Sequence, residues 1–318
     1  MDVTQWVERV TGGDIRLLSR ALSEIENHGP LADSLLAALF PHSGQAWTIG
    51  VTGAPGAGKS TVVTALAAHF REQDKRVAIL AVDPTSPFTG GSILGDRIRM
   101  QIHDADPDVY IRSMATRGSL GGLAAAAADL IIALDAARFD VILIETVGVG
   151  QAEVDVVRLA STVALLLTPS TGDDIQAMKA GIMEIADAFV INKADLPGAD
   201  RLETELRAML SLKTDHEEDQ PPIMRTVATT SDGIEELGNA LRPIKRDNNR
   251  SADYWKRRLS EIIRKRLMDE VARAQLPAKR LDEAAEQIAD RKLNPYAFAA
   301  ELTSELIPAA PLSPPTED

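Results

Sequence analysis

A glycine-rich segment of the chain reads Gly53-Ala54-Pro55-Gly56-Ala57-Gly58-Lys59-Ser60-Thr61. It follows an apolar run, Trp47–Val51, and precedes a helical pattern from Lys59 to about Phe70. This strand, glycine-rich turn and helix match the P-loop, G-x-x-x-x-G-K-[ST]. The main-chain N–H groups of such a loop point inward, and the N-terminus of the following helix adds partial positive charge, so the loop favours binding of phosphate. We expect all nine residues to bind a nucleotide, with Lys59 reaching the β- and γ-phosphates and Ser60 ligating Mg²⁺.

An acidic residue and a glycine follow a later apolar run, Val141–Ile144. Glu145 ends that run, where a carboxylate can hold Mg²⁺ directly or through water. Gly148, three residues further on, can sense the γ-phosphate through its amide. Both residues are therefore predicted to belong to the nucleotide and metal site.

Two aspartates are further candidates for the metal site. Asp83 directly follows the run Val77–Val82, and acids at the carboxyl ends of parallel strands face the ligand crevice. It could order the metal's waters or the attacking water. Asp96 lies in a glycine-rich loop that runs into a helix, as a mobile switch would. For both residues, capping of a helix or turn stays open as an alternative.

Guanine specificity is predicted by Asn192-Lys193-Ala194-Asp195, an N-K-x-D motif after the run Phe189–Ile191. A carboxylate in the base pocket accepts from the ring N–H and the exocyclic amine of guanine. Adenine presents an acceptor in place of that ring N–H. A site whose buried polar groups are left unmatched by a ligand rejects that ligand strongly. Further on, Ala228-Thr229-Thr230 could close over the base, although capping of the next helix explains it equally well.

The fold class follows from apolar runs that alternate with helical segments. We predict an α/β domain with a doubly wound, mostly parallel sheet, because short runs of this kind are buried on both faces. The predicted strands are Trp47–Val51, Val77–Val82, Val109–Ile111, Val141–Ile144, Val163–Leu167, Phe189–Ile191 and a weaker Ile223–Val227. The alanine-rich stretch Leu120–Ala137 is predicted as a packed helix.

The chain is predicted to have three parts: an N-terminal helical extension (1–45), a P-loop G domain (46–246) and a C-terminal helical arm (247–318). Helical spacing in the extension predicts one helical segment, ended by Gly29-Pro30, and then a short helix. Asp247–Ser251 is a predicted linker. The helix Trp255–Val271 has an apolar stripe that must be buried, and we favour a second copy of the chain as its partner.

Composition narrows the function classes. The formal net charge of -13 disfavours nonspecific binding to nucleic acid. There is no cysteine, which excludes disulfides and thiolate metal sites and fits a reducing cytoplasm. No run of about 18 apolar residues occurs, so we expect a soluble protein with no membrane partner.

Three segments resemble signatures of the methylmalonyl-CoA mutase-associated GTPases, the MeaB/ArgK-type G-protein chaperones. They are Val82–Arg97, Glu145–Gln151 and Gly172–Lys179. The resemblance implies GTP as substrate and GDP as product, three switches, and a role for Lys179 in activated hydrolysis. It also implies a homodimer through the C-terminal arm. The implied partner is an adenosylcobalamin-dependent acyl-CoA mutase. By this resemblance, the GTPase gates loading of the mutase's cofactor and protects the mutase from inactivation.

Two other functions stay open at this point. A GTPase that matures another metalloenzyme is one, although the Cys/His-rich metal tract that such proteins often carry is missing. A kinase of an amino-acid transport system is the other, and N-K-x-D argues against it. Val149 stands where Ras-like proteins carry a water-orienting glutamine, which predicts slow intrinsic turnover and stimulation by a partner.

Overall fold

A computed structural model describes residues 2–83, 106–115, 122–146, 159–169, 186–212, 220–241, 252–273 and 278–299. The chain divides into two compact units, Met1–Ser251 and Ala252–Asp318. The predicted linker Asp247–Ser251 lies outside the described residues.

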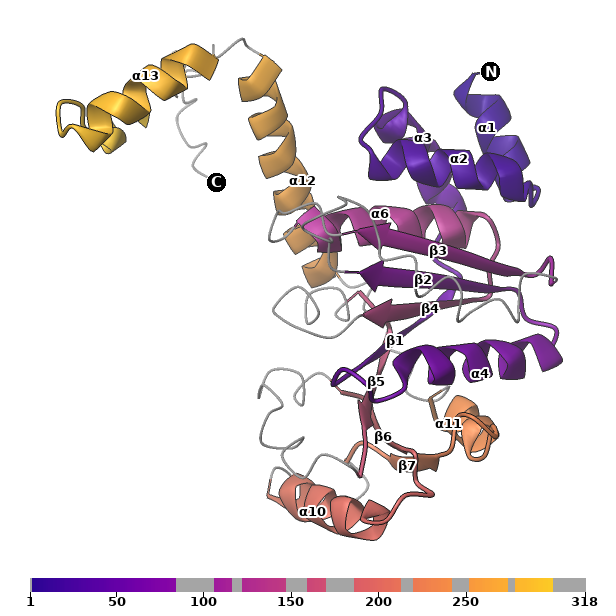
Figure 1. The fold of residues 1–318 in the computed structure, drawn as a ribbon. Coiled ribbons are helices and arrows are strands. Elements are labelled where there is room, and N and C mark those ends of the chain that lie inside the picture. Colours follow the sequence, from indigo (N-terminus) through magenta and orange to yellow (C-terminus); the bar gives the residue numbers. More distant parts are fainter. Residues whose placement is uncertain are drawn as a thin grey trace, which may run out of the picture. The chain divides into compact units, whose positions relative to one another are not determined.

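The first unit is built on a sheet of seven parallel strands in the order β3-β2-β4-β1-β5-β6-β7 (Figure 1). The strands are β1 (Trp47–Gly53), β2 (Val77–Asp83), β3 (Val109–Ala115), β4 (Val141–Thr146), β5 (Thr162–Leu167), β6 (Ala188–Asn192) and β7 (Ile223–Thr226). This confirms the predicted doubly wound α/β fold, and every pairing between these seven strands is parallel. All carboxyl ends therefore meet at one edge of the sheet.

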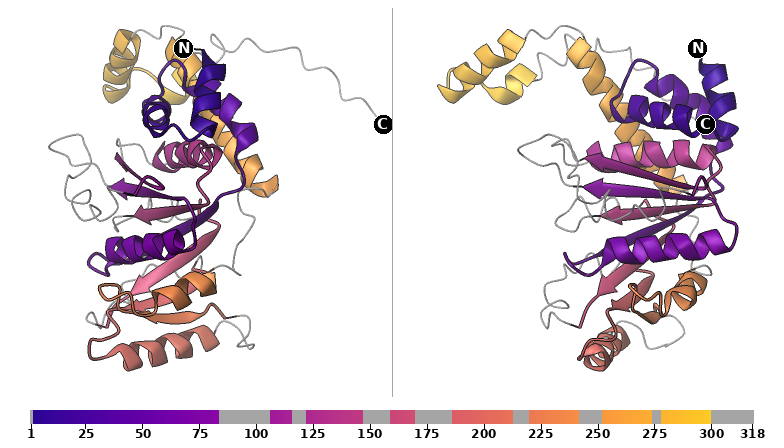
Figure 2. Two further views of the ribbon diagram at one scale, coloured as in Figure 1. Left: turned by 90° about the vertical axis from the view of Figure 1, so that its right-hand side faces the viewer. Right: turned by 45° about the vertical axis from the view of Figure 1, so that its right-hand side comes forward.

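Helices cover the sheet on both sides, and the strands β1, β4, β5 and β6 are buried along their whole length. Side chains of α4 (Lys59–Glu72) and α11 (Ile234–Leu241) share one apolar cluster with alternate residues of β1, β4 and β5. The intervening residues of β5 and β6 pack against α10 (Ala199–Ser211). Figure 2 shows α4 and α11 side by side, with α10 beyond β6. The alanine-rich stretch forms α6 (Gly122–Ala136), as predicted.

The N-terminal segment contains one more helix than the sequence spacing predicted. It forms α1 (Val3–Thr11), α2 (Ile15–Glu26) and α3 (Ala32–Leu39), followed by the short 3₁₀ helix η1 (Phe40–His42). The prediction of one helical segment before Gly29-Pro30 was wrong because Asp14 starts a new helix. Its carboxylate accepts from Leu17 N at 3.0 Å, and this bond, together with Arg9, lowers the pKa of Asp14.

These N-terminal helices are tied to the edge strand β3 and to α6. The hydroxyl groups of Ser19 and Tyr110 are 3.1 Å apart, and the Arg112 guanidinium pairs with Glu26. The carboxylate of Asp135 accepts from the amides of residues 44 to 46, directly before β1. The extension is therefore part of the compact first unit.

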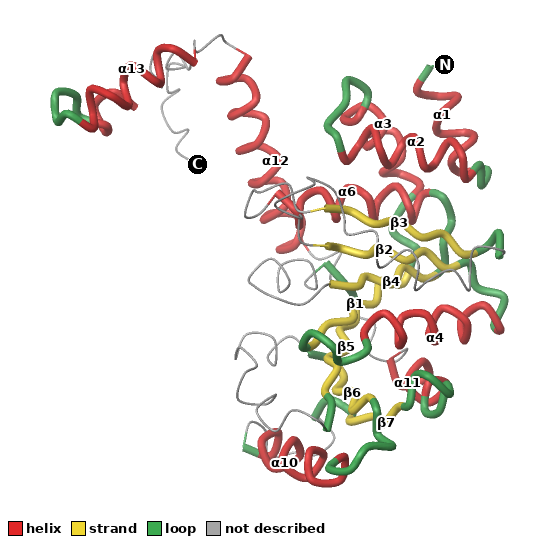
Figure 3. Tube along the Cα trace, viewed as in Figure 1, coloured by secondary structure: helices red, strands yellow, loops and turns green. Residues whose placement is uncertain are grey.

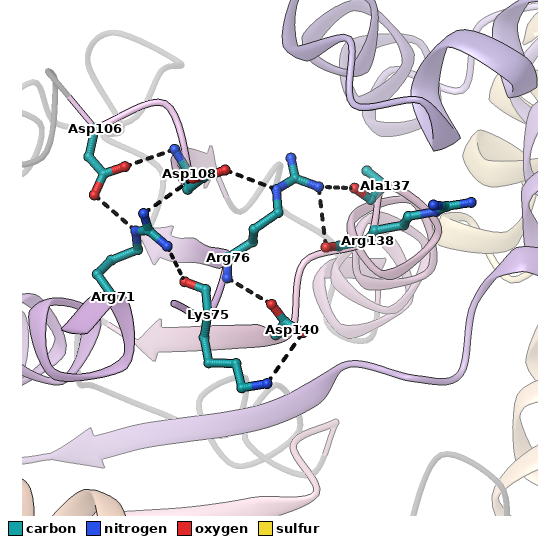
Figure 4. Close-up of polar contacts among 8 residues, drawn as sticks. All are labelled: Arg71, Lys75, Arg76, Asp106, Asp108, Ala137, Arg138 and Asp140. Atoms are coloured by element: carbon teal, nitrogen blue, oxygen red, sulfur yellow. Dashed lines mark hydrogen bonds and ion pairs between the residues drawn. The ribbon is translucent and has the colours of Figure 1, made fainter. Parts of the chain in front are cut away.

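The amino-terminal edge of the sheet is held by charged side chains that satisfy one another (Figure 4). Arg71, near the end of α4, donates to Asp106 at 2.9 Å and to Asp108 at 3.2 Å. The hydrogen bond to Asp106 is the largest cause of the raised pKa of Arg71. Arg76 also donates to Asp108, and its main-chain amide donates to Asp140 at 2.8 Å. This network fixes the starts of β2, β3 and β4.

The second unit contains α12 (Ala252–Arg273) and α13 (Ala278–Ala289). On α12, Leu259, Ile263 and Leu267 recur every fourth residue and are 56%, 49% and 49% exposed. They form an apolar stripe on one side of the helix. Within the described ranges, no helix is long and apolar enough to cross a membrane.

Candidate nucleotide-binding site

The P-loop occupies the turn between β1 and α4, at the carboxyl edge of the sheet (Figure 3). Gly58, the residue before the helix, has φ +90°, and a Cβ there would lie 2.4 Å from the side-chain nitrogen Nδ2 of Asn192. Glycine is therefore required both by the backbone conformation and by the close approach of a second motif. The first amides of α4 follow directly, at the end of a helix that favours anions.

Lys59 folds back over the loop that precedes it. Its side chain is buried, and its Nζ donates to the main-chain oxygens of Gly53 at 2.7 Å and Ala54 at 3.1 Å. These carbonyl groups hold the ammonium group at the loop. Phosphate oxygens offer it stronger, charge-assisted hydrogen bonds, so it is suited to bind a β- or γ-phosphate.

Ser60 and Glu145 meet beside the P-loop although 85 positions separate them in sequence. The strand register places Glu145 opposite Val51, two residues before Gly53. The Ser60 hydroxyl donates a short hydrogen bond to Oε1 of Glu145, which is 3% exposed. A hydroxyl and a carboxylate at the start of the P-loop helix are the hard oxygen donors that Mg²⁺ prefers, so these two residues fit that ion.

The base motif and the P-loop form one connected structure through Asn192. Its Nδ2 donates to the carbonyl oxygen of Ala57 at 2.8 Å, and its Oδ1 accepts from Ala228 N at 3.3 Å. Lys193 Nζ donates to Gly56 O at 3.0 Å. Asp195 is exposed at the same edge. The predicted phosphate and base elements are thus brought together.

Sequence reasoning missed Thr226, which supports the base motif from β7. Its hydroxyl donates to Oδ1 of Asn192 at 3.1 Å, and its carbonyl oxygen accepts from Ala194 N at 3.1 Å. Thr226 is 1% exposed. The only available signal was the weaker predicted strand Ile223–Val227, which contains Thr226, and the observed register places Thr226 opposite Asn192.

Several predicted site residues lie outside what the structure describes. Asp83 ends β2 at the correct edge, but its side chain is not described. Asp96, Gly148 and Lys179 fall in undescribed ranges, so their roles stay predictions. Among the described residues, no group of three or more His, Cys, Asp or Glu could hold a metal ion. The Ser60–Glu145 pair, with one carboxylate, is not a site of that kind.

A P-loop on the first strand of a parallel sheet, a hydroxyl–carboxylate pair at its helix and an N-K-x-D turn against it define a P-loop nucleotide hydrolase. The profile of the methylmalonyl Co-A mutase-associated GTPase MeaB family matches residues 18–281. The chain belongs to this family, and its activity is the hydrolysis of GTP to GDP and phosphate.

Individual relatives agree with this assignment. A Pyrococcus abyssi protein provisionally named a GTPase is 44% identical over 96% of this chain and 97% of its own length. The Escherichia coli GTPase ArgK is 37% identical over 74% of this chain and 73% of its own. The Caenorhabditis elegans methylmalonic aciduria type A homolog is 36% identical over 70% of this chain and 57% of its own.

A solved structure described as a LAO/AO transport system kinase resembles the whole chain. The TM-score is 0.66 at 26% identity, covering 96% of this chain and 97% of that one. That protein is named as a kinase, whereas the family and the Pyrococcus abyssi and Escherichia coli relatives are named as GTPases. The fold is shared, and the names of the relatives connect this GTPase family with methylmalonyl-CoA metabolism.

Proposed function

We propose that this GTPase is a chaperone of an adenosylcobalamin-dependent acyl-CoA mutase such as methylmalonyl-CoA mutase, that it gates loading of the mutase's cofactor, and that it protects the enzyme from inactivation. The observation that carries the nucleotide part is the Asn192 amide, which joins the P-loop to the loop at Ala228. The family description and the methylmalonic aciduria homolog support the choice of partner.

Each half of the site has a separate task in this proposal. Asp195 accepts the two N–H donors of guanine, while Lys59 neutralises charge on the β- and γ-phosphates. Mg²⁺, held by Ser60 and Glu145, would supply electrostatic stabilisation of the phosphates. Asp83 and Asp96 are proposed to order water around that metal, and the Gly148 amide to sense the γ-phosphate.

Control by the partner is assigned to Lys179. We place it on a segment that the mutase orders, so that its ammonium group reaches the phosphates only in the complex. Lys179→Ala should then keep near-normal basal hydrolysis and lose the response to the mutase. Full stimulation of that variant, measured as phosphate release with and without mutase, would remove Lys179 from the mechanism.

The C-terminal arm is proposed to make a cytoplasmic homodimer. The apolar stripe on α12 supports this, because exposed leucine and isoleucine at helical spacing favour a helical partner. Deleting residues from about 250 onward should give a monomer that still binds GDP, as measured by light scattering and nucleotide titration. Complete aggregation, or loss of GDP binding, would instead place the arm in the core of the first unit.

The experiment that tests the proposed function is stimulation of turnover. The chain is mixed with methylmalonyl-CoA mutase or a related mutase, and phosphate release from GTP is compared with release from the GTPase alone. We expect clear stimulation, because activated hydrolysis in this class depends on a group ordered by the partner. No stimulation and no co-purification of a B12 enzyme from the native host would contradict the choice of partner.

The kinase alternative has its own test because the structural relative is named as a transport system kinase. A kinase would transfer the γ-phosphoryl group from ATP to a protein of an amino-acid transport system. Equal affinity for ATP and GTP, with labelled phosphate on a binding protein, would favour that function. Stimulation by a different metalloenzyme would favour maturation of that enzyme instead.

A further inference from the structure

The helix α11 carries a glycine in its interior, at Gly238. Glycine is a poor helix former because it loses the most backbone entropy. α11 has only eight residues, so an unfavourable residue in its interior weakens it noticeably. A glycine at such a position usually has a packing or functional reason. Gly238 is buried, and the reason lies on the neighbouring helix α4.

A side chain at Gly238 would collide with His69. An ideal Cβ built at Gly238 lies 2.6 Å from both Cδ2 and Nε2 of the imidazole ring. His69 is 9% exposed, and its Nε2 is 2.8 Å from the side-chain nitrogen Nε2 of Gln73. The ring also packs against Phe70 at a centroid distance of 5.4 Å. The ring is therefore held from two directions, and it cannot yield without disturbing one of these contacts.

The contact matters because both helices begin at the nucleotide site. α4 starts in the P-loop, and α11 follows the loop 227–233 on the base side. Gly238 lies five residues after Gly233, which is about 7.5 Å along a helix. The Gly233 carbonyl accepts from Leu237 N at 3.1 Å, and Ala228 N donates to Asn192. A displacement of α11 is therefore transmitted to the loop that holds the base motif.

We propose that Gly238 and His69 set the spacing between α4 and α11 and thereby position the base-side loop for guanine nucleotides. Both are positioning residues, and neither touches the nucleotide. The inference rests on the proposed guanine site. It predicts that a larger residue at Gly238 impairs nucleotide affinity through a steric contact, and that removing the opposing ring restores that affinity.

The test is a double-mutant cycle read by GDP titration and by GTP turnover. Gly238→Ala should weaken GDP binding by about fivefold or more, because overpacking shifts the neighbouring backbone. The turnover number at saturating GTP should stay unchanged, since Lys59, Ser60 and Glu145 are not moved. His69→Ala alone should weaken GDP binding by less than Gly238→Ala does, because a cavity replaces the ring that sets the spacing. Gly238→Ala with His69→Ala should recover the affinity of the parent.

A matched control separates spacing from helix propensity. Asn239→Ala also places alanine in α11, but Asn239 is exposed and next to the contact in sequence. It should bind GDP like the parent chain. If Gly238→Ala also binds like the parent, the ring yields and the proposal is overturned. Weakened binding that His69→Ala does not rescue overturns it as well.

A folding defect and a missing guanine preference are separated by two further measurements. Should Gly238→Ala fail to fold, the double variant decides, because it lacks the collision and must fold and bind GDP like the parent for the proposal to stand. The parent's preference for GDP over ADP is measured first. Absence of that preference contradicts the proposed guanine site, whereas an intact preference with no effect at Gly238 contradicts only the spacing role.

Discussion

The two edges of the seven-stranded sheet use charged side chains in opposite ways. At the amino-terminal edge, Arg71 donates to carboxylates of the loop that precedes β3 (Figure 4). At the carboxyl-terminal edge, Lys59 and Lys193 donate to main-chain carbonyl oxygens of the P-loop. Carbonyl groups position an ammonium group without neutralising it, whereas a carboxylate neutralises its partner. The first edge is thus built for stability and the second to receive an anion.

The largest expected effect tests the carboxyl-terminal edge. Lys59→Ala should reduce GTP turnover by about 1,000-fold or more, because it removes the cation that stabilises charge on the phosphates. The melting temperature should stay close to that of the parent, since Lys59 contributes charge rather than packing. Phosphate release and thermal unfolding measure the two quantities. Turnover at the parental rate would mean that the chemistry lies elsewhere.

The next effect tests the base side of the same edge. GTP and GDP should bind in the micromolar range and ATP at least about 100-fold more weakly, because Asp195 pairs with two donors that adenine lacks. Asp195→Asn should shift the preference from guanine toward xanthine, whose extra carbonyl suits an amide donor. Titrations with GDP, ADP and XDP measure this. An unchanged preference for GDP in the variant would remove Asp195 from base recognition.

The amino-terminal edge should respond in stability and not in activity. Arg71→Ala should lower the free energy of unfolding by about 2 kcal/mol, because it removes the charge-assisted hydrogen bonds to Asp106 and Asp108, although Asp108 still accepts from Arg76. Arg71→Lys should recover only part of this, since an ammonium group cannot replace the guanidinium fork. Denaturant unfolding gives the stabilities. A large loss of turnover per folded molecule would show that the two edges are not independent.

The smallest effect concerns Thr226, which supports Asn192 from β7. Thr226→Val keeps the shape but removes the hydroxyl donor, and we expect about a three- to tenfold weaker binding of GDP, equivalent to roughly 1 kcal/mol. Thr226→Ser restores the donor and should restore most of the affinity. If the valine variant binds GDP like the parent, Ala228 N alone is sufficient to orient the Asn192 amide.

Much of the fold was readable from the sequence because its signals are local. All seven strands were predicted from short apolar runs, and the helix that begins at Lys59 was predicted from the P-loop. The division of the N-terminal segment into α1 and α2 was not predicted. Helical spacing continues across Gly12-Gly13, so the break depended on the capping bond of Asp14 to Leu17.

The candidate site shows the same difference between local signals and contacts distant in sequence. The P-loop and the N-K-x-D motif are legible in the sequence alone, because the chemistry of phosphate and guanine fixes which residues must be adjacent in the chain. Three contacts depend on how the chain folds: Glu145 accepts from Ser60, Thr226 supports Asn192 and Gly238 faces His69. These contacts join residues between 34 and 169 positions apart. Strand order, register and helix packing bring such residues together, and no local pattern encodes them.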